Sequence, residues 1–385
     1  MIRSSRICRI LYHPRLKVPP WSRRSAMAMT ITVPVPVPTS SKNQQHRIMF
    51  STTSIPFRPP TSPPLVTTDI ISASAFGSNR NRNGNGNDDN DKIAILRMNR
   101  KPANALSMEM CNELSNALRT ITESSNNGID NTAVSAIIIS SSIPNIFSAG
   151  IDIQKELYQP DDINRLSQFW FSFQQLFLDL YGLNHGNGNG ISTIAAVNGH
   201  APAGGCMIAL SCDYRIMLNN PKLRIGYNES KLGITAPSWM SQQYIDFIGS
   251  RHKAELALLL GKLYSPQEAF TIGLVDELLD ENDGIVSQEE NEYDDDDDDH
   301  NNNNYNISLN VVEKVAIEKA KEFIQIPTIA QQNVKKWIRQ PLIDLLVQER
   351  QKDNDEFCDL VTSPKVQKYI KHYLHSLQSK SKSKV

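Results

Sequence analysis

The stretch Asn198-Gly199-His200-Ala201-Pro202-Ala203-Gly204-Gly205-Cys206 follows the apolar run 191–197 and is rich in glycine and alanine. The apolar run predicts a buried strand, and the Gly-Gly pair predicts a sharp turn that opens a helix near Gly204. The first N–H groups of a helix have no partner within it, and small residues leave them accessible. The segment therefore predicts a strand–turn–helix unit whose backbone binds a negatively charged oxygen.

Two further segments complete the pattern. Phe147-Ser148-Ala149-Gly150-Ile151-Asp152 lies upstream, after the β-branched run 134–139, and offers a second turn of small residues. Gly226-Tyr227-Asn228-Glu229-Ser230 lies downstream and supplies one carboxylate. Either turn alone could be an ordinary strand-to-helix corner, and Glu229 alone could be a surface residue. Together they are the groups needed to stabilise an enolate and to move a proton.

Strands and helices alternate along the middle of the chain, which predicts an α/β fold with at least partly parallel strands. Apolar runs predict strands at 93–98, 134–139, 191–197 and 213–218. Helices are expected after Ser107, over 169–180, from Gly204 and from Ser250 to Leu260. The sequence Ser265-Pro266-Gln267-Glu268 predicts a capping box with proline at the first helical position.

Composition divides the chain into four regions. Residues 1–90 are expected to be a transit peptide and a disordered low-complexity segment, with order beginning near Lys92. Residues 91–279 are expected to form the core. Residues 280–306 contain twelve acidic side chains and an Asn-rich run, which predicts a disordered insert, and a calcium site there lacks the required ligand spacing. Helical patterning over 307–385 predicts a C-terminal helical region.

Charge is unevenly distributed. Residues 1–68 carry ten Arg and Lys and no Asp or Glu, whereas the remaining chain has a formal charge of −11. A basic, Ser-rich, acid-free N-terminus is typical of an organellar transit peptide, although a disordered basic arm would have the same composition. The C-terminus Ser383-Lys384-Val385 is not the peroxisomal Ser-Lys-Leu address. These features favour the mitochondrial matrix, and the acidic remainder argues against a nucleic-acid partner.

Other classes of protein are disfavoured by what the sequence lacks. It contains no apolar run of the length that spans a membrane. Its five cysteines are scattered, which argues for a reducing compartment and against a disulfide framework. We find no Cys/His cluster with metal-ligand spacing and expect no metal. His200 lies beside the glycine turn, but a lone histidine is more often structural or solvated.

The three segments, together with Cys212-Asp213-Tyr214-Arg215 and the continuation of the Glu229 segment to Ile234, resemble the enoyl-CoA hydratase/isomerase (crotonase) superfamily. Within it, the chain most resembles the mitochondrial Δ3,Δ2-enoyl-CoA isomerases. The resemblance spans Lys92 to Leu279 and continues more weakly beyond. It implies a crotonase-like fold of ββα repeats with a spiral core. It also implies an acyl-CoA substrate, no separate cofactor, and a homotrimer or a dimer of trimers.

The resemblance assigns roles to individual residues. The N–H groups of Ala149 and Gly204 would form an oxyanion hole, and Glu229 would be the catalytic base. Asp152 would fix the first turn, and Asn228 would orient Glu229 or touch the substrate. The substrate-binding residues implied are Ser148, Ala149, Gly150, Ile151, Asp152, Gly204 and Asn228. Lys155, Lys231 and Arg251 are candidate partners of the CoA phosphates, and Trp239, Met240 and Tyr244 are candidates for an acyl pocket or the core.

One absence separates the activities within the superfamily. Hydratases place a second glutamate on the helix after the glycine turn, and the corresponding residue here is Met207, which cannot activate water. The expected reaction is therefore conversion of 3-enoyl-CoA to trans-2-enoyl-CoA in the β-oxidation of unsaturated fatty acids. Two alternatives are a hydratase or other crotonase-type enzyme, and a non-catalytic crotonase scaffold that binds protein or nucleic acid.

Overall fold

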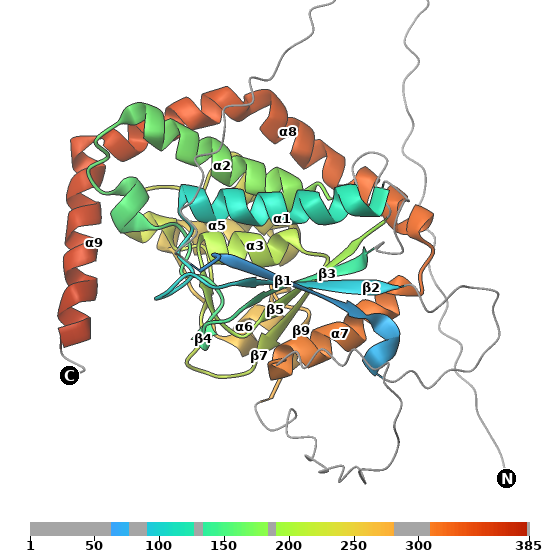
Figure 1. The fold of residues 1–385 in the computed structure, drawn as a ribbon. Coiled ribbons are helices and arrows are strands. Elements are labelled where there is room, and N and C mark those ends of the chain that lie inside the picture. The colour runs from blue at the N-terminus through green and yellow to red at the C-terminus, as the bar shows by residue number, and fades with distance from the viewer. Residues whose placement is uncertain (1–62, 77–90, 127–133, 184–189, 281–308, 383–385) are drawn as a thin grey trace, which may run out of the picture. The chain divides into compact units, whose positions relative to one another are not determined.

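The computed structural model describes residues 63–76, 91–126, 134–183, 190–280 and 309–382. Six strands form the main sheet in the order β1 (Val66–Ser72), β2 (Lys92–Met98), β3 (Val134–Ser141), β5 (Ser192–Val197), β7 (Tyr214–Leu218) and β9 (Glu277–Leu279), as Figure 1 shows. Strand β1 is antiparallel to β2, and every other pair is parallel. The expected α/β class with largely parallel pairing is confirmed.

Helices cover both faces of this sheet, because side chains alternate between the faces along each strand. Ala94 and Leu96 belong to the apolar cluster that includes α1 (Met108–Asn126), α2 (Ile163–Tyr181) and α3 (Gly204–Ser211). Ile93 and Ile95 belong to a second cluster with α7 (Val311–Ile324). In Figure 1 these helices lie on opposite sides of the sheet. Burial on both faces explains why the strands are nearly continuous apolar runs.

A second, smaller sheet was not predicted and positions the site. Its three short parallel strands are β4 (Asn145–Ile146), β6 (Gly199–Pro202) and β8 (Ile225–Gly226). The first leads into Phe147–Asp152, the second into α3, and the third into the segment that carries Glu229. Parallel pairing therefore places the ends of all three motif segments together.

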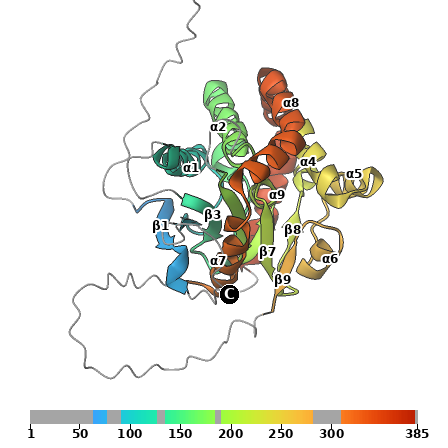
Figure 2. The same ribbon diagram turned by 90° about the vertical axis from the view of Figure 1, so that its right-hand side faces the viewer.

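The remaining helices are α4 (Ser238–Ile248), α5 (Arg251–Leu260), α6 (Pro266–Thr271), α8 (Thr328–Thr362) and α9 (Pro364–Lys382), with short helical turns η1 (Ala73–Phe76), η3 (Ile153–Leu157) and η4 (Glu229–Leu232). Ser250 caps α5, and Ser265 and Glu268 form the predicted capping box of α6. Helix α8 packs along α2 (Figure 2). The rings of Trp170 on α2 and Phe357 on α8 stack with their centroids 3.6 Å apart. The C-terminal helices thus pack on the core of the same chain.

Two sequence expectations are corrected. Order was expected to begin near Lys92, but β1 already pairs with β2 along its whole length, and its Val66 and Ile71 are buried. A seven-residue edge strand that contains polar residues has little recognisable sequence pattern, and β1 forms because it pairs with β2. The helix expected from Phe169 begins at Ile163, where the side chain of Asp162 accepts from the N–H of Asn164. The expectations for residues 1–62 and 281–308 lie outside the described residues.

Candidate active site

The two turns of small residues meet in the structure. Gly150 has φ +81°, and a Cβ placed on it would lie 3.1 Å from the Gly204 nitrogen and 3.0 Å from the Pro202 oxygen. A Cβ on Gly205 would lie 2.5 Å from the Ser148 oxygen, closer than such atoms approach. Both glycines therefore allow a backbone contact that a side chain would prevent. This geometry brings the two motif segments into contact.

Helix α3 begins with unpaired amides. Its N-cap residue Ala203 has φ +50° and supplies no side-chain cap, and the first helical bond runs from Met207 N–H to the Ala203 oxygen at 3.0 Å. The N–H groups of Gly204, Gly205 and Cys206 therefore have no partner within the helix. Together with the positive end of the helix dipole, they suit a developing negative charge.

The Ala149 amide differs from the preorganised donor that the sequence predicted. Its N–H donates to the carbonyl oxygen of Ala103 at 2.9 Å, so it is already engaged in this structure. The next amide, that of Gly150, approaches the Ser148 hydroxyl oxygen at 3.2 Å. A substrate oxygen could use Ala149 N–H only by sharing or displacing the Ala103 carbonyl.

Asn104 organises this turn and was missed by the sequence reasoning. It is fully buried with φ +49°, and its side-chain nitrogen donates to Ser141 Oγ at 2.7 Å and to the Phe147 oxygen at 3.0 Å. Its carbonyl accepts from Ser148 Oγ at 2.8 Å. The available signal was its place after a predicted strand, because asparagine tolerates the left-handed conformation better than most residues.

Asp152 fixes the turn, as expected. Its side chain accepts from Lys155 N–H at 3.0 Å, which caps η3, and pairs with Arg100 at 2.6 Å. Ile151 forms a bridge with Leu106 beside it. Of the candidate CoA-phosphate partners, Lys155 pairs with Glu109 at 2.7 Å. These contacts give Asp152 and Ile151 a structural explanation that does not require a substrate.

Glu229 is the buried carboxylate of the site. It is the first residue of η4 and is 7% exposed. Its Oε2 atom has no hydrogen-bond partner in the described part of the chain. Burial raises its pKa from 4.5 to about 7, and its own backbone N–H only partly opposes that shift. A carboxylate with this pKa can both accept and release a proton near neutral pH.

Glu229 lies near the first turn of α3. Burial raises the pKa of the Cys206 thiol well above its usual value, and the Glu229 carboxylate adds to that rise. The same carboxylate contributes to the raised pKa of the Tyr227 hydroxyl, which burial dominates. The thiol and phenol therefore stay protonated, which leaves Glu229 as the group among these three that exchanges a proton near neutral pH.

Glu229 also lines a pocket of about 470 Å³ between η4, α4 and α5. Its walls are mainly small or apolar, with the charged Arg251 and Glu255 beside them, and include Ser230, Thr235, Ala236, Ser241, Ile245, Leu258 and Leu259. The volume is in the range of small-molecule sites. Trp239, Met240 and Tyr244 do not line it and are core residues, at most 2% exposed.

The other named residues have clear positions. Met207 is fully buried in α3, and Asn228 precedes η4 without a side-chain cap. The His200 carbonyl accepts from Phe147 and Ser148 N–H, a structural role. Among the described residues, no three His, Cys, Asp or Glu side chains are grouped to hold a metal, and no helix is both long and apolar enough to cross a bilayer.

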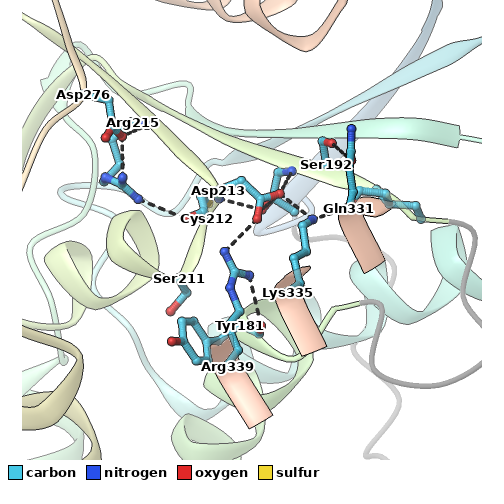
Figure 3. Close-up of polar contacts among 12 residues, drawn as sticks. Tyr181, Ser192, Ser211, Cys212, Asp213, Arg215, Asp276, Gln331, Lys335 and Arg339 are labelled. Atoms are coloured by element: carbon cyan, nitrogen blue, oxygen red, sulfur yellow. Dashed lines mark hydrogen bonds and ion pairs between the residues drawn. The ribbon is translucent and has the colours of Figure 1, made fainter. Parts of the chain in front are cut away.

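The motif Cys212-Asp213-Tyr214-Arg215 makes structural contacts, and its Asp213 anchors α8 (Figure 3). Buried Asp213 accepts from Lys335 at 2.6 Å and from Arg339 at 2.7 Å, two cations one helical turn apart on α8. Burial opposes ionisation of Asp213, but the two cations hold its pKa below the usual value. Arg215 pairs with Asp276 and donates to the Cys212 oxygen at 3.0 Å.

Comparison with known proteins agrees with this arrangement. Residues 88–290 match the family model described as enoyl-CoA hydratase/isomerase. The mouse protein "Enoyl-CoA delta isomerase 1, mitochondrial" is 32% identical over 75% of this chain and 84% of its own. The crotonyl-CoA hydratase of Syntrophomonas wolfei is 32% identical over 49% of this chain and 66% of its own.

Solved structures extend the comparison to the fold. The crystal structure of human mitochondrial delta3-delta2-enoyl-CoA isomerase is 30% identical, has a TM-score of 0.61, and is matched over 75% of this chain and 95% of its own. This similarity confirms the crotonase-like α/β fold with a helical C-terminal region. With two turns meeting at a helix start and a buried glutamate beside them, the chain belongs to the enoyl-CoA hydratase/isomerase family.

Proposed function

We propose that this protein is an enoyl-CoA isomerase that converts 3-enoyl-CoA to trans-2-enoyl-CoA. The Glu229 carboxylate removes a proton from C2, and the electrons of that C–H bond form a dienolate. The protonated Glu229 then returns the proton to C4, and the double bond is left between C2 and C3. Atoms and charge balance with one carboxyl group and without any external reactant.

Backbone amides stabilise the negative charge on the thioester oxygen of the dienolate. Gly204 N–H is one donor, at the uncapped start of α3. Ala149 N–H is the second, and the thioester oxygen takes it over from the Ala103 carbonyl to which it donates in the structure. Loss of one donor of this kind typically costs about 10²–10³ in rate.

The observation that carries the proposal is the state of Glu229. A buried carboxylate with an unpaired oxygen and a pKa of about 7 is costly for the fold. The buried structural carboxylate of Asp213, by contrast, pairs with two cations. The proposal explains why Glu229 is kept in this costly environment.

Isomerisation is favoured over hydration because a second acid is missing from α3. Met207 occupies the position where the superfamily's hydratases carry their second glutamate, and its thioether can neither donate a proton nor activate water. Hydration remains the competing proposal, because the crotonyl-CoA hydratase of Syntrophomonas wolfei is among the relatives. The two reactions use different substrates and can be measured separately.

The acyl chain beyond C4 extends into the pocket that Glu229 lines. Ala236, Ile245 and Leu258 supply apolar contacts there, which is what a hydrocarbon tail requires. This places the tail between α4 and α5 instead of against Trp239 and Tyr244. The size of the Leu258 side chain should then influence the preferred chain length.

The localisation is inferred from the relatives, and the assembly from the exposed surface. Because the mouse relative is mitochondrial by name, we place the protein in the mitochondrial matrix, in the β-oxidation of unsaturated fatty acids. Large apolar side chains are exposed on several helices, most strongly Trp337 (73%) and Ile338 (72%) on α8 and Leu259 (67%) on α5. Exposed apolar side chains on different helices suit a ring such as a trimer, in which each copy uses two different surfaces.

Two assays on purified protein test the function. With 3-enoyl-CoA substrates of graded length, formation of the conjugated 2-enoyl thioester should be readily measured in the wild type. Hydration of 2-enoyl-CoA should be slower by orders of magnitude, and the Glu229→Gln variant should lose isomerisation while remaining folded. Robust hydration would favour the hydratase alternative, and inactivity of the wild type towards both substrates would favour a non-catalytic scaffold.

A further inference from the structure

Gln243 is a buried amide at the centre of α4 whose presence the fold alone does not require. Its side chain is fully buried, and it follows the fully packed Trp239 and Met240 on the same helix. Burying an amide is costly unless its polar atoms are all hydrogen bonded, and an apolar residue would fill the same space without that cost. Its hydrogen-bond partners therefore indicate its role.

Those partners come from two different elements, the segment that precedes η4 and the last residue of α3. The Tyr227 hydroxyl donates to Gln243 Oε1 at 3.0 Å, and Gln243 Nε2 donates to Ser211 Oγ at 3.3 Å. Ser211 Oγ in turn donates to the Met207 carbonyl at 2.8 Å. Tyr227, Ser211 and Met207 are each at most 1% exposed, so water does not replace any of these bonds.

The chain of bonds spans the two halves of the proposed chemistry. Tyr227 lies two residues before Glu229, and Met207 lies one turn after Gly204 on α3. Backbone bonds from Ala201 N–H to the Arg224 oxygen at 2.9 Å and from Ala203 N–H to the Gly226 oxygen at 2.8 Å join the ends of β6 and β8. Gln243 adds a side-chain contact beyond this ladder, because it ties Tyr227, two residues before Glu229, to Ser211 at the end of α3.

We propose that Gln243 is a positioning residue that sets the place of the Glu229 carboxylate relative to the Gly204 amide. The inference rests on the proposed function, because it assigns a role in that reaction. Misplacement of a reacting group by about 1 Å can cost about 10²-fold in rate. The effect belongs in kcat, because Gln243 lies away from the pocket that receives the substrate and contributes nothing to uniform binding.

Five variants test this role, and the fifth is the rescue variant Gln243→Glu. Gln243→Met removes the amide at similar volume, Tyr227→Phe removes only its hydroxyl partner, and a third variant combines the two. Gln242→Met is the matched control, because Gln242 is the neighbouring residue and its side chain donates to Asp246 on its own helix. The readouts are kcat and KM for 3-enoyl-CoA per folded molecule, with thermal unfolding measured in parallel.

We expect Gln243→Met and Tyr227→Phe each to lower kcat by about 10–100-fold with KM changed less than about 3-fold. The combined variant should be no worse than the poorer single variant, because both changes cut the same link. Gln243→Glu, which when protonated can restore both bonds, should recover part of the loss. Unchanged kcat in the folded single variants would overturn the proposal, even if they unfold at lower temperature. Failure of the proposed function is distinct, because it would appear as inactivity of the wild type and of Gln242→Met.

Discussion

Replacing Glu229 by glutamine should change how the free energy of unfolding depends on pH. The folded protein keeps the Glu229 proton up to about pH 7, whereas an unfolded chain releases it near its ordinary pKa of 4.5. Between these values the folded state binds the extra proton. The stability that this protonation provides is therefore fully present below the unfolded pKa and is lost as pH rises through about 7.

With these two pKa values, the linkage relation predicts that the free energy of unfolding falls by about 2.5 kcal/mol between pH 5 and pH 8 because of this one group. The Glu229→Gln variant has no proton to lose, so its free energy of unfolding minus that of the wild type should rise by about this amount over the same interval. Urea unfolding at several pH values, at matched protein concentration, measures the difference.

Glu255→Gln is the control, because Glu255 lines the same pocket but is exposed to solvent. Its free energy of unfolding should follow that of the wild type across the pH range. If the Glu229→Gln curve also ran parallel to the wild type, the carboxylate would have ionised without a burial penalty. That result would refute the reasoning that links its environment to its chemistry.

Three further outcomes follow. Asp213→Asn leaves Lys335 and Arg339 without their buried anion and should lower the free energy of unfolding in urea by about 3–5 kcal/mol. Asp344→Asn, on the exposed side of α8, should change it little, and equal effects of the two variants would contradict the anchoring role. Gly205→Ala should lower the free energy of unfolding by about 1–3 kcal/mol, and the melting temperature with it, because the added methyl group meets the Ser148 oxygen. An unchanged melting temperature would rule out that close contact. The kcat/KM for isomerisation should rise with pH through about 7 and then level off, since the base must be ionised, and a pH-independent profile would exclude Glu229 as that base.

The features predicted from sequence are those with strong local patterns. Apolar β-branched runs identified the parallel strands, and Ser250 and Ser265 identified helix starts. Glu229 and Gly204 were recognised because each lies in a distinctive short motif. Their proximity was then a consequence of the fold, through the parallel pairing of β6 with β8.

What escaped prediction depends on distant partners. Strands β4 and β8 have two residues each, too few for any periodicity to appear. Asn104 and Gln243 are polar, and nothing near them in sequence marks them as buried. The bond between Ala149 and Ala103 forms across two loops, so no local pattern indicates that this predicted donor is engaged in the free protein.

The most direct test of the account is the fate of the transferred hydrogen. A 3-enoyl-CoA carrying deuterium at C2 would be converted in a single turnover, and the product analysed for deuterium at C4. A single buried carboxylate that serves both carbons predicts label at C4 in the wild type, because the proton it takes has little access to water. A product whose C4 hydrogen comes entirely from solvent would show that the proton taken from C2 is not the one delivered to C4, and would contradict a Glu229 carboxyl that carries it between the two carbons out of contact with water.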